Sequence, residues 1–366
     1  MNNVEMCSFA INRKDLRDIA LMLAENQLFI PSFVVDKIDI YNPIAYLNEY
    51  ITFGTQVILV ADRNLVTRWI ALIENKSQEK KLKIDHQYRL AAAIMAFAQC
   101  SNISIEPSIA LYEFAMNAGN DEANKELNIF RIADNINPQS WTDLALGRSD
   151  TFIYESPQLP EMYFNQKVDF MMPLKSWRRN YVLTLKIAEL ELKGSTPENN
   201  ILEIIKWMYE DFLFGANALM LANYYFAPGK PRKKLLKNLR SADRKKAIKG
   251  IKNATWDLTL LTEWFNRIED CHNNGEIILL CSLDKKLREI ALSRIDLSED
   301  LDLSDIYLKQ FKIFWKEDIA SKISIIYEDY LKKLNHSSRK LNEYNYRTKM
   351  EKFILDGEKF ILDWIK

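Results

Sequence analysis

Two short runs of the chain contain no polar position and predict buried strands. Residues from Val57 to Ala61 are all apolar or small, and the run from Ile277 to Cys281 repeats this form. A run of this length without polar residues at helical spacing is typical of a strand that is buried on both faces of a parallel sheet. The hydrophobic pattern therefore predicts two central strands of an α/β sheet.

Apolar residues at helical spacing fill much of the remaining chain. Helices are predicted for the following ranges: Thr67–Glu74, His86–Gln99, Arg179–Leu192, Pro197–Tyr225 and an amphipathic C-terminal region of residues 298–366. Thr196 suits the N-cap and Pro197 the first position of one of these helices. The C-terminal stripe that includes Phe311 and Trp315 is typical of a core, and a groove-binding or dimerising helix is the alternative.

Composition agrees with a large, helix-rich globular protein. Among 366 residues, 48% are apolar and 27% charged, and only 9 Gly and 10 Pro interrupt the elements. This length can form two domains, or one domain with a large insertion. The formal net charge is zero, so attraction to nucleic acid would have to come from a local patch.

The cysteines and the N-terminal pattern predict a cytoplasmic protein. The four cysteines are scattered without a CxxC spacing, which excludes an evident disulfide framework or zinc site. No basic segment followed by an apolar core marks a signal peptide. The longest apolar run, Leu90 to Ala98, is too short to cross a bilayer, so we expect no membrane partner.

One segment, from Lys230 to Lys252, is strongly basic. Only Asp243 opposes its positive charges, which could follow a phosphate backbone. The alternative is a solvated helix face, and the sequence leaves both open. The residues that we predict to bind nucleic acid are Lys233, Lys234, Lys237, Arg240, Arg244, Lys245 and Lys249.

Four acids occur in an ordered pattern along the chain. Asp62 ends the first predicted strand and Asp284 follows the second, whereas Glu113 and Asp257 lie in predicted helices. Taken singly, each has a simpler explanation as a turn former, a cap or a solvated side chain. Taken together, carboxylates that converge at a sheet edge are suitable oxygen ligands for Mg²⁺ or Mn²⁺, and such ions can activate water against a phosphodiester.

The same residues resemble the PIN-domain nucleases. The resemblance rests on Val60-Ala61-Asp62-Arg63-Asn64, on Glu113 after Pro107, on Asp257 in Ala254-Thr255-Trp256-Asp257, and on Ser282-Leu283-Asp284. The last element is similar to the family's Thr/Ser-x-Asp-x-x-Leu motif and is the most specific. The resemblance implies that Asp62, Glu113, Asp257 and Asp284 form a catalytic metal site with Mg²⁺ or Mn²⁺, supported by the polar residues Asn64 and Ser282.

The resemblance also implies a domain plan. We expect a PIN-like three-layer fold, in which helices flank a parallel sheet, with a large, mainly helical insertion and a helical C-terminal extension. The expected parts are an N-terminal helical extension (1–50), a nuclease core (51–114 and 245–297), the insertion (115–244) and the C-terminal region (298–366).

Three functions fit these observations. The first is a metal-dependent endoribonuclease, a phosphodiester hydrolase for which the resemblance favours RNA over DNA, although the sequence itself does not distinguish the two substrates. The second is a non-catalytic nucleic-acid-binding or regulatory module that keeps the fold. The third is an interaction protein whose helical parts contact a second copy of the chain or a regulatory protein partner.

Overall fold

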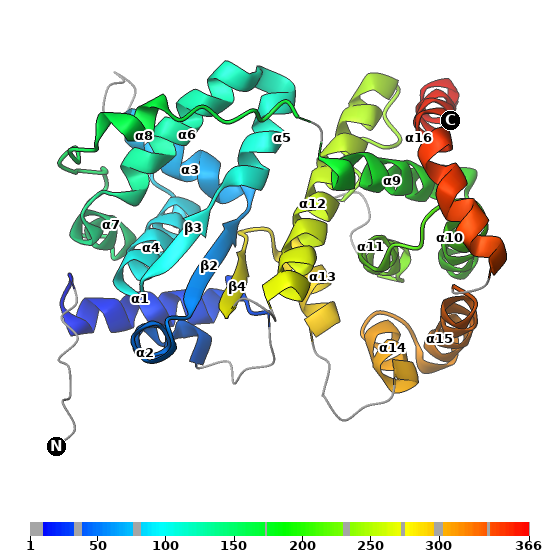
Figure 1. Ribbon diagram of the computed structural model, residues 1–366, viewed down its shortest axis with the longest axis horizontal. Coiled ribbons are helices and arrows are strands. Elements are labelled where there is room, and N and C mark those ends of the chain that lie inside the picture. Colours follow the sequence, from blue (N-terminus) through cyan, green and yellow to red (C-terminus); the bar gives the residue numbers. More distant parts are fainter. Residues whose placement is uncertain are drawn as a thin grey trace. The chain divides into compact units, whose positions relative to one another are not determined.

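A computed structural model describes residues 10–32, 39–75, 82–172, 174–229, 235–271, 275–295, 303–334 and 337–365 (Figure 1). The chain forms two compact units. Unit 1 comprises Met1–Met172 and Trp264–Arg288, and unit 2 comprises Pro173–Glu263 and Glu289–Lys366. Helices α12 (Arg244–Cys271) and α13 (Lys285–Ile295) contribute residues to both units.

Unit 1 contains a four-stranded mixed sheet in the order β1-β4-β2-β3. Strand β2 (Gln56–Ala61) pairs in parallel with β3 (Ile103–Glu106) on one side and with β4 (Glu276–Cys281) on the other. Leu59, Ala61 and Leu279 are fully buried, as their unbroken apolar runs predicted. The chain is mostly helical around this small sheet, so the expected α/β class is confirmed at this coarse level.

The edge strand β1 (Phe29–Ile30) was not predicted. It pairs antiparallel with β4, with Phe29 opposite Cys281, so the sheet is mixed and not purely parallel. A two-residue strand has too few positions to show a period, and the segment before it was predicted only as a helical extension. The N-terminal residues therefore supply a strand as well as helix α1 (Arg13–Asn26).

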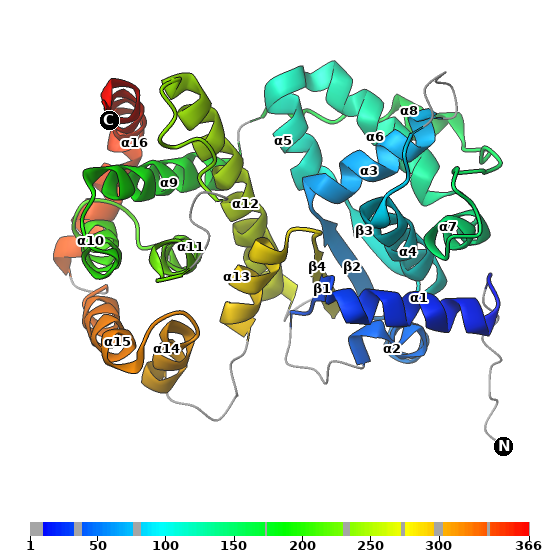
Figure 2. The same cartoon turned by 180° about the vertical axis from the view of Figure 1, so that it is seen from behind.

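Helix α4 (His86–Cys100) forms the centre of the core of unit 1. Every residue from Leu90 to Ala98 is buried, because α4 contacts α1, α3 (Arg63–Glu74), α7 (Pro138–Ala145) and β3. Figure 2 shows α1, α4 and α7 side by side. The apolar run that is too short for a membrane is therefore a helix surrounded by protein on all sides.

The remaining elements of unit 1 complete its helical layers. They are η1 (Asp39–Tyr41), α2 (Pro43–Phe53), α5 (Ser108–Ala118), α6 (Asn120–Asp134) and α8 (Glu161–Asn165). The strands β2, β3 and β4 all fall inside the predicted core ranges. Residues 115–172, which were predicted as part of the insertion, belong to unit 1, and residues 245–263 belong to unit 2.

The helices of unit 2 bury one another's apolar stripes. Besides its parts of α12 and α13, the unit contains α9 (Lys175–Lys193), α10 (Pro197–Glu210), α11 (Ala216–Phe226), α14 (Leu303–Lys312), α15 (Glu317–Lys332) and α16 (Ser337–Asp363). Phe311 and Ile323 are fully buried, so the C-terminal stripe is core, as its spacing indicated. Trp315 Nε1 donates a hydrogen bond of 2.5 Å to Asn223 Oδ1 of α11.

The predicted helix from Pro197 to Tyr225 is wrong in its middle. Thr196 caps α10 as expected, by accepting a hydrogen bond from Asn199 N at 3.2 Å, but the chain leaves the helix between Glu210 and Ala216. Phe212 lies in this break and is almost fully buried. A buried aromatic residue in a turn continues the apolar pattern, which is why the pattern did not reveal the break.

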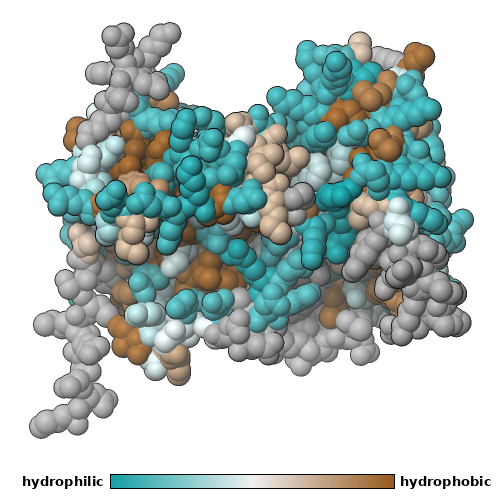
Figure 3. All heavy atoms as spheres, turned by 45° about the horizontal axis from the view of Figure 1, so that its top comes forward, coloured by the Kyte–Doolittle hydropathy of each residue, from teal (hydrophilic) through white to brown (hydrophobic). Residues whose placement is uncertain are grey.

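Hydrophilic side chains cover most of the face in Figure 3, and hydrophobic residues reach that surface in separate groups. Within the described residues, no helix is long and apolar enough to cross a membrane.

Candidate functional site at the carboxyl edge of the sheet

Strands β2 and β4 bring two of the predicted acidic segments together. Ala61 lies opposite Cys281 in the parallel register, so Asp62 and Ser282, the next residues of each chain segment, emerge side by side. Asp62 N donates a hydrogen bond of 3.0 Å to Cys281 O, which extends the pairing by one residue. Parallel strands place their carboxyl ends at one edge, where ligands of open α/β sheets commonly bind.

The hydroxyl of Ser282 connects the two segments. Ser282 Oγ donates a hydrogen bond of 2.7 Å to Asp62 Oδ2 and accepts one of 2.9 Å from Asp284 N. Asn64 Nδ2 donates to the same Asp62 oxygen at 3.2 Å. Ser282 is fully buried and Asp62 is 5% exposed, so packing and hydrogen bonds fix the direction of the Asp62 carboxylate.

Burial raises the pKa of the Asp62 carboxyl above its usual range. The hydrogen bonds from Ser282 and Asn64 act in the opposite direction, and the negative charge of Asp284 raises the pKa further. Asp284 Oδ1 accepts a hydrogen bond of 2.8 Å from Lys286 N at the start of α13. The edge therefore holds a buried carboxylate and a second, half-buried carboxylate close enough to repel it.

Arg288 stabilises the turn that contains Ser282 and Asp284 by hydrogen bonds. Its Nη1 donates to Ser282 O at 2.7 Å and its Nη2 to Asn26 O at 3.2 Å, which ties the turn to the end of α1. No motif in the sequence connected Arg288 with Asn26, because 262 positions separate them.

Strand β3 ends at Glu106, which lies opposite Val60 of β2. Glu106 Oε1 accepts a hydrogen bond of 2.7 Å from Ser108 N at the start of α5, and Arg267 Nη2 lies 3.3 Å from Glu106 Oε2. The sequence did not single out Glu106 or Arg267. A charge on this third strand end is therefore already balanced by an arginine.

A second arginine lies directly after Asp62. Arg63 forms a two-point ion pair with Glu126 of α6, one contact of which measures 2.9 Å. Its guanidinium also lies 4.4 Å from the centre of the Phe114 ring. These contacts connect the start of α3 with α5 and α6, and no motif or spacing in the sequence predicted them.

The other two predicted acids occupy different elements. Glu113 is half-buried in α5 of unit 1, next to Phe114. Asp257 is half-buried in α12, within unit 2. On the same helix, Thr259 and Thr262 accept hydrogen bonds from Asn180 of α9 at 3.2 and 3.1 Å. Among the described residues, no three Asp, Glu, His or Cys side chains form a group that could hold a metal ion.

In the basic segment, Arg240 and Arg244 contact other parts of the chain, whereas several lysines are exposed. Arg244 Nε donates to Ile361 O at 2.9 Å, and its guanidinium lies 4.9 Å from the centre of the Trp364 ring, so it holds the end of α16. Arg240 pairs with Glu191 at 3.0 Å. Lys237, Arg240, Lys245 and Lys249 are exposed, whereas Lys233 and Lys234 lie outside the described residues.

No protein-family model, curated protein or solved structure matches this chain. Its function must therefore be inferred from the residues at the sheet edge.

Proposed function

We propose that unit 1 is a PIN-like domain and that the protein is a metal-dependent nuclease that hydrolyses phosphodiester bonds in RNA. The observation that carries this proposal is the Asp62–Ser282–Asp284 arrangement at the carboxyl edge of two parallel strands. The ordered motifs Asp62-Arg63-Asn64 and Ser282-Leu283-Asp284 resemble those of the family. The three-layer arrangement and the RNA substrate are parts of the proposal.

The chemistry of the edge fits Mg²⁺ or Mn²⁺. These ions prefer oxygen ligands, and the edge offers the carboxylates of Asp62 and Asp284 beside the Ser282 hydroxyl. A divalent cation would relieve the repulsion between the two carboxylates and would favour the ionised form of buried Asp62. On the resemblance alone, we assign Glu113 as a further acid of the site, whereas Asp257, the fourth acid of the resemblance, belongs to unit 2.

When bound, such an ion would activate a water molecule and neutralise charge on the phosphodiester. The protein's own part is to hold the oxygen ligands in place. Ser282 and Asn64 orient the Asp62 carboxylate, and Arg288 fixes the turn from which Asp284 extends. Exposed Lys237, Lys245 and Lys249 are the side chains that we assign to the substrate backbone.

Two buried cysteines without disulfide partners, Cys100 and Cys281, fit a reducing compartment, and we place the activity in the cytoplasm. A homodimer or a regulatory protein partner is compatible with this proposal.

One observation favours a second candidate function. The described residues contain no group of three potential metal ligands. A non-catalytic nucleic-acid-binding or regulatory module would not need such a group. In that case binding would depend on salt and not on metal, and neutralising Asp62 or Asp284 would leave binding unchanged or strengthen it.

The test is cleavage of labelled single-stranded RNA and DNA with Mg²⁺, with Mn²⁺ and with a chelator. We expect metal-dependent cleavage of RNA by the parent protein and its loss, by at least about a hundredfold, in Asp284→Asn, because the variant removes a metal ligand. Asp150→Asn is the matched control, since that side chain is 92% exposed and pairs only with Arg89 among the described residues. Cleavage by Asp284→Asn at the parent rate would show that the assigned site is wrong.

A further inference from the structure

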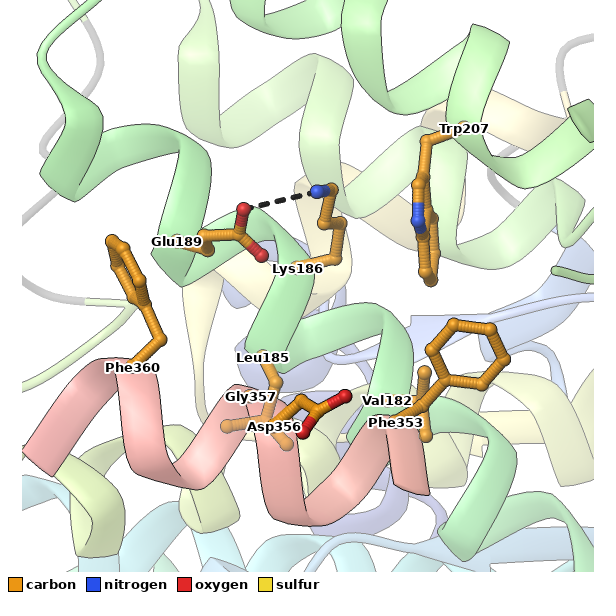
Figure 4. Close-up of a pocket in the computed structure, with 9 residues that line it drawn as sticks. All are labelled: Val182, Leu185, Lys186, Glu189, Trp207, Phe353, Asp356, Gly357 and Phe360. Atoms are coloured by element: carbon orange, nitrogen blue, oxygen red, sulfur yellow. Dashed lines mark hydrogen bonds and ion pairs between the residues drawn. The ribbon is translucent and has the colours of Figure 1, made fainter. Parts of the chain in front are cut away.

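Unit 2 contains a cavity of about 250 Å³ between helices α9, α10 and α16. Figure 4 shows Phe360 at one end and Trp207 with Phe353 at the other. Asp356 lies between these ends on α16, and Lys186 and Glu189 line the opposite side on α9. The proposed nuclease site uses none of these residues.

Gly357 allows the floor of this cavity to form. A Cβ atom added at Gly357 would lie 3.1 Å from Leu185 Cβ and 3.2 Å from its Cδ1, so a larger residue would push α16 away from α9. Phe353, Gly357 and Phe360 follow one another at helical spacing, which places them on one face of α16. Because α16 contacts α9 closely at Gly357, the rings of Phe353 and Phe360 lie on either side of this contact.

Packing fixes the aromatic end of the cavity. The Trp207 ring stacks on Phe212, with centroids 5.3 Å apart and an angle of 21° between the planes. Phe353 meets the Trp207 ring edge-on, with centroids 5.9 Å apart, and also contacts Phe212 at 5.4 Å. Because Phe212 is almost fully buried, these rings need little reorganisation to receive a ligand.

The ring faces of this cavity already attract ammonium groups of the chain. Lys186 Nζ lies 5.4 Å from the centre of the Trp207 ring, and Lys193 Nζ lies 5.8 Å from that of Phe360. Aromatic faces carry a negative quadrupole that attracts cations at such distances. Glu189 pairs with both lysines, at 3.0 and 2.5 Å, so the three charges form one network.

Asp356 is the remaining charge of the cavity. Its side chain is exposed, and within the described part of the chain it forms no ion pair or hydrogen bond. The residues that line the cavity comprise one ammonium group and two carboxylates, and Lys193 adds a second ammonium group beside Phe360, so the four charges balance. Glu189 pairs with both lysines, which leaves the Asp356 carboxylate as the charge that a cation could contact together with a ring face.

We propose that this cavity binds a small methylated ammonium ion, with its cationic head between Phe360 and Phe353 and close to Asp356. The rings supply cation–π attraction and apolar contact, and Asp356 supplies the opposite charge. The Lys186–Glu189 pair closes the side of the cavity without adding net charge.

The test compares choline with 3,3-dimethylbutan-1-ol, a neutral molecule of the same shape, by ligand-observed NMR titration of the full chain. We expect choline to bind at least about fivefold more tightly, because only choline carries the charge that the rings and Asp356 recognise. Asp356→Asn should weaken choline binding about twofold to fivefold and leave the neutral molecule unaffected. Phe360→Leu should weaken choline binding to a similar extent.

Glu351→Gln is the matched control, because Glu351 is an exposed acid of the same helix that pairs with Arg178 and does not line the cavity. Thermal unfolding of each variant identifies a loss of fold. Equal binding of choline and its neutral analogue, an equal loss in Glu351→Gln and Asp356→Asn, or absence of choline binding at millimolar concentration would overturn the proposal. Tighter binding of adenosine than of choline would also overturn it, since a stacked neutral base would then be the ligand.

Discussion

The hydroxyl of Ser282 uses both its donor and its acceptor capacity at the sheet edge, towards Asp62 Oδ2 and Asp284 N. A buried polar group that loses its partner costs about 1–3 kcal/mol, whereas removing a group that makes no bond costs little. The chain contains both cases, because Ser101 Oγ is equally buried and has no hydrogen-bond partner within the described residues.

These two serines give a matched comparison. We expect Ser282→Ala to lower the free energy of unfolding by about 2 kcal/mol and to reduce cleavage, because the Asp62 carboxylate loses its shortest hydrogen bond. Ser101→Ala should change the free energy by less than about 0.5 kcal/mol. Urea unfolding followed by circular dichroism measures both. Similar losses in the two variants would contradict the role assigned to the Ser282 hydroxyl.

At the residue scale, the sequence was informative only over short distances. Asn64 follows Asp62 by two positions and Ser282 precedes Asp284 by two, and local motifs revealed both pairs. The partners of the arginines were not predictable, because Arg63 meets Glu126 and Arg267 meets Glu106 only after the chain has folded. A single sequence contains no periodicity or spacing that reports such contacts.

At the scale of elements, the packing of the segment around Lys237 against α12 requires a residue without a side chain at Gly250. A Cβ atom there would lie 1.8 Å from Lys237 O and 2.8 Å from Lys237 C, so the backbone of the basic segment crosses α12 at this glycine. Backbone atoms cannot turn aside as a flexible side chain can.

We therefore expect Gly250→Ala to lower the free energy of unfolding by about 3 kcal/mol, because α12 and the segment around Lys237 must separate. Gly215→Ala is the comparison, since its nearest neighbour is the flexible end of the Leu183 side chain at 3.3 Å. Chemical denaturation of both variants measures the difference. Equal stability of Gly250→Ala and the parent would show that the segment does not pack against α12.

Elements were predictable where the pattern was long or uninterrupted. The runs that became β2 and β4 and the helices α4 and α9 follow directly from it. The strand β1 and the break after α10 escaped, because the first is two residues long and the second contains the buried Phe212. Tertiary packing decides such short segments, and local propensity does not.

At the scale of the whole molecule, the division into units was not predictable from motif order. Motifs mark the strands of unit 1, but the boundaries fall at Met172–Pro173, within α12 and within α13. A helix that continues through a boundary shows no change in its hydrophobic spacing. The free energy of unfolding also belongs to the whole molecule, and the ionisation of a single buried group can make it depend on pH.

Asp62 makes the stability depend on pH, in the direction opposite to that of an acid such as Asp15, whose pKa is lowered by an arginine partner. Because burial raises its pKa above the unfolded value of about 3.9, the native state binds more protons than the unfolded state above that pH. The stabilising contribution of protonated Asp62 is complete below about pH 3.9 and is lost as the pH rises through the folded pKa. Asparagine resembles the protonated acid and does not ionise.

In the presence of chelator, we therefore expect Asp62→Asn to be more stable than the parent at pH 7, while the two should converge towards pH 4. Added Mg²⁺ or Mn²⁺ should raise the melting temperature of the parent and not that of the variant, since only the ionised carboxylate holds the cation. Thermal unfolding across this pH range, with Asp150→Asn as the control, measures both effects. A variant less stable than the parent at pH 7 in chelator would mean that the hydrogen bonds from Ser282 and Asn64 outweigh the cost of burying the charge.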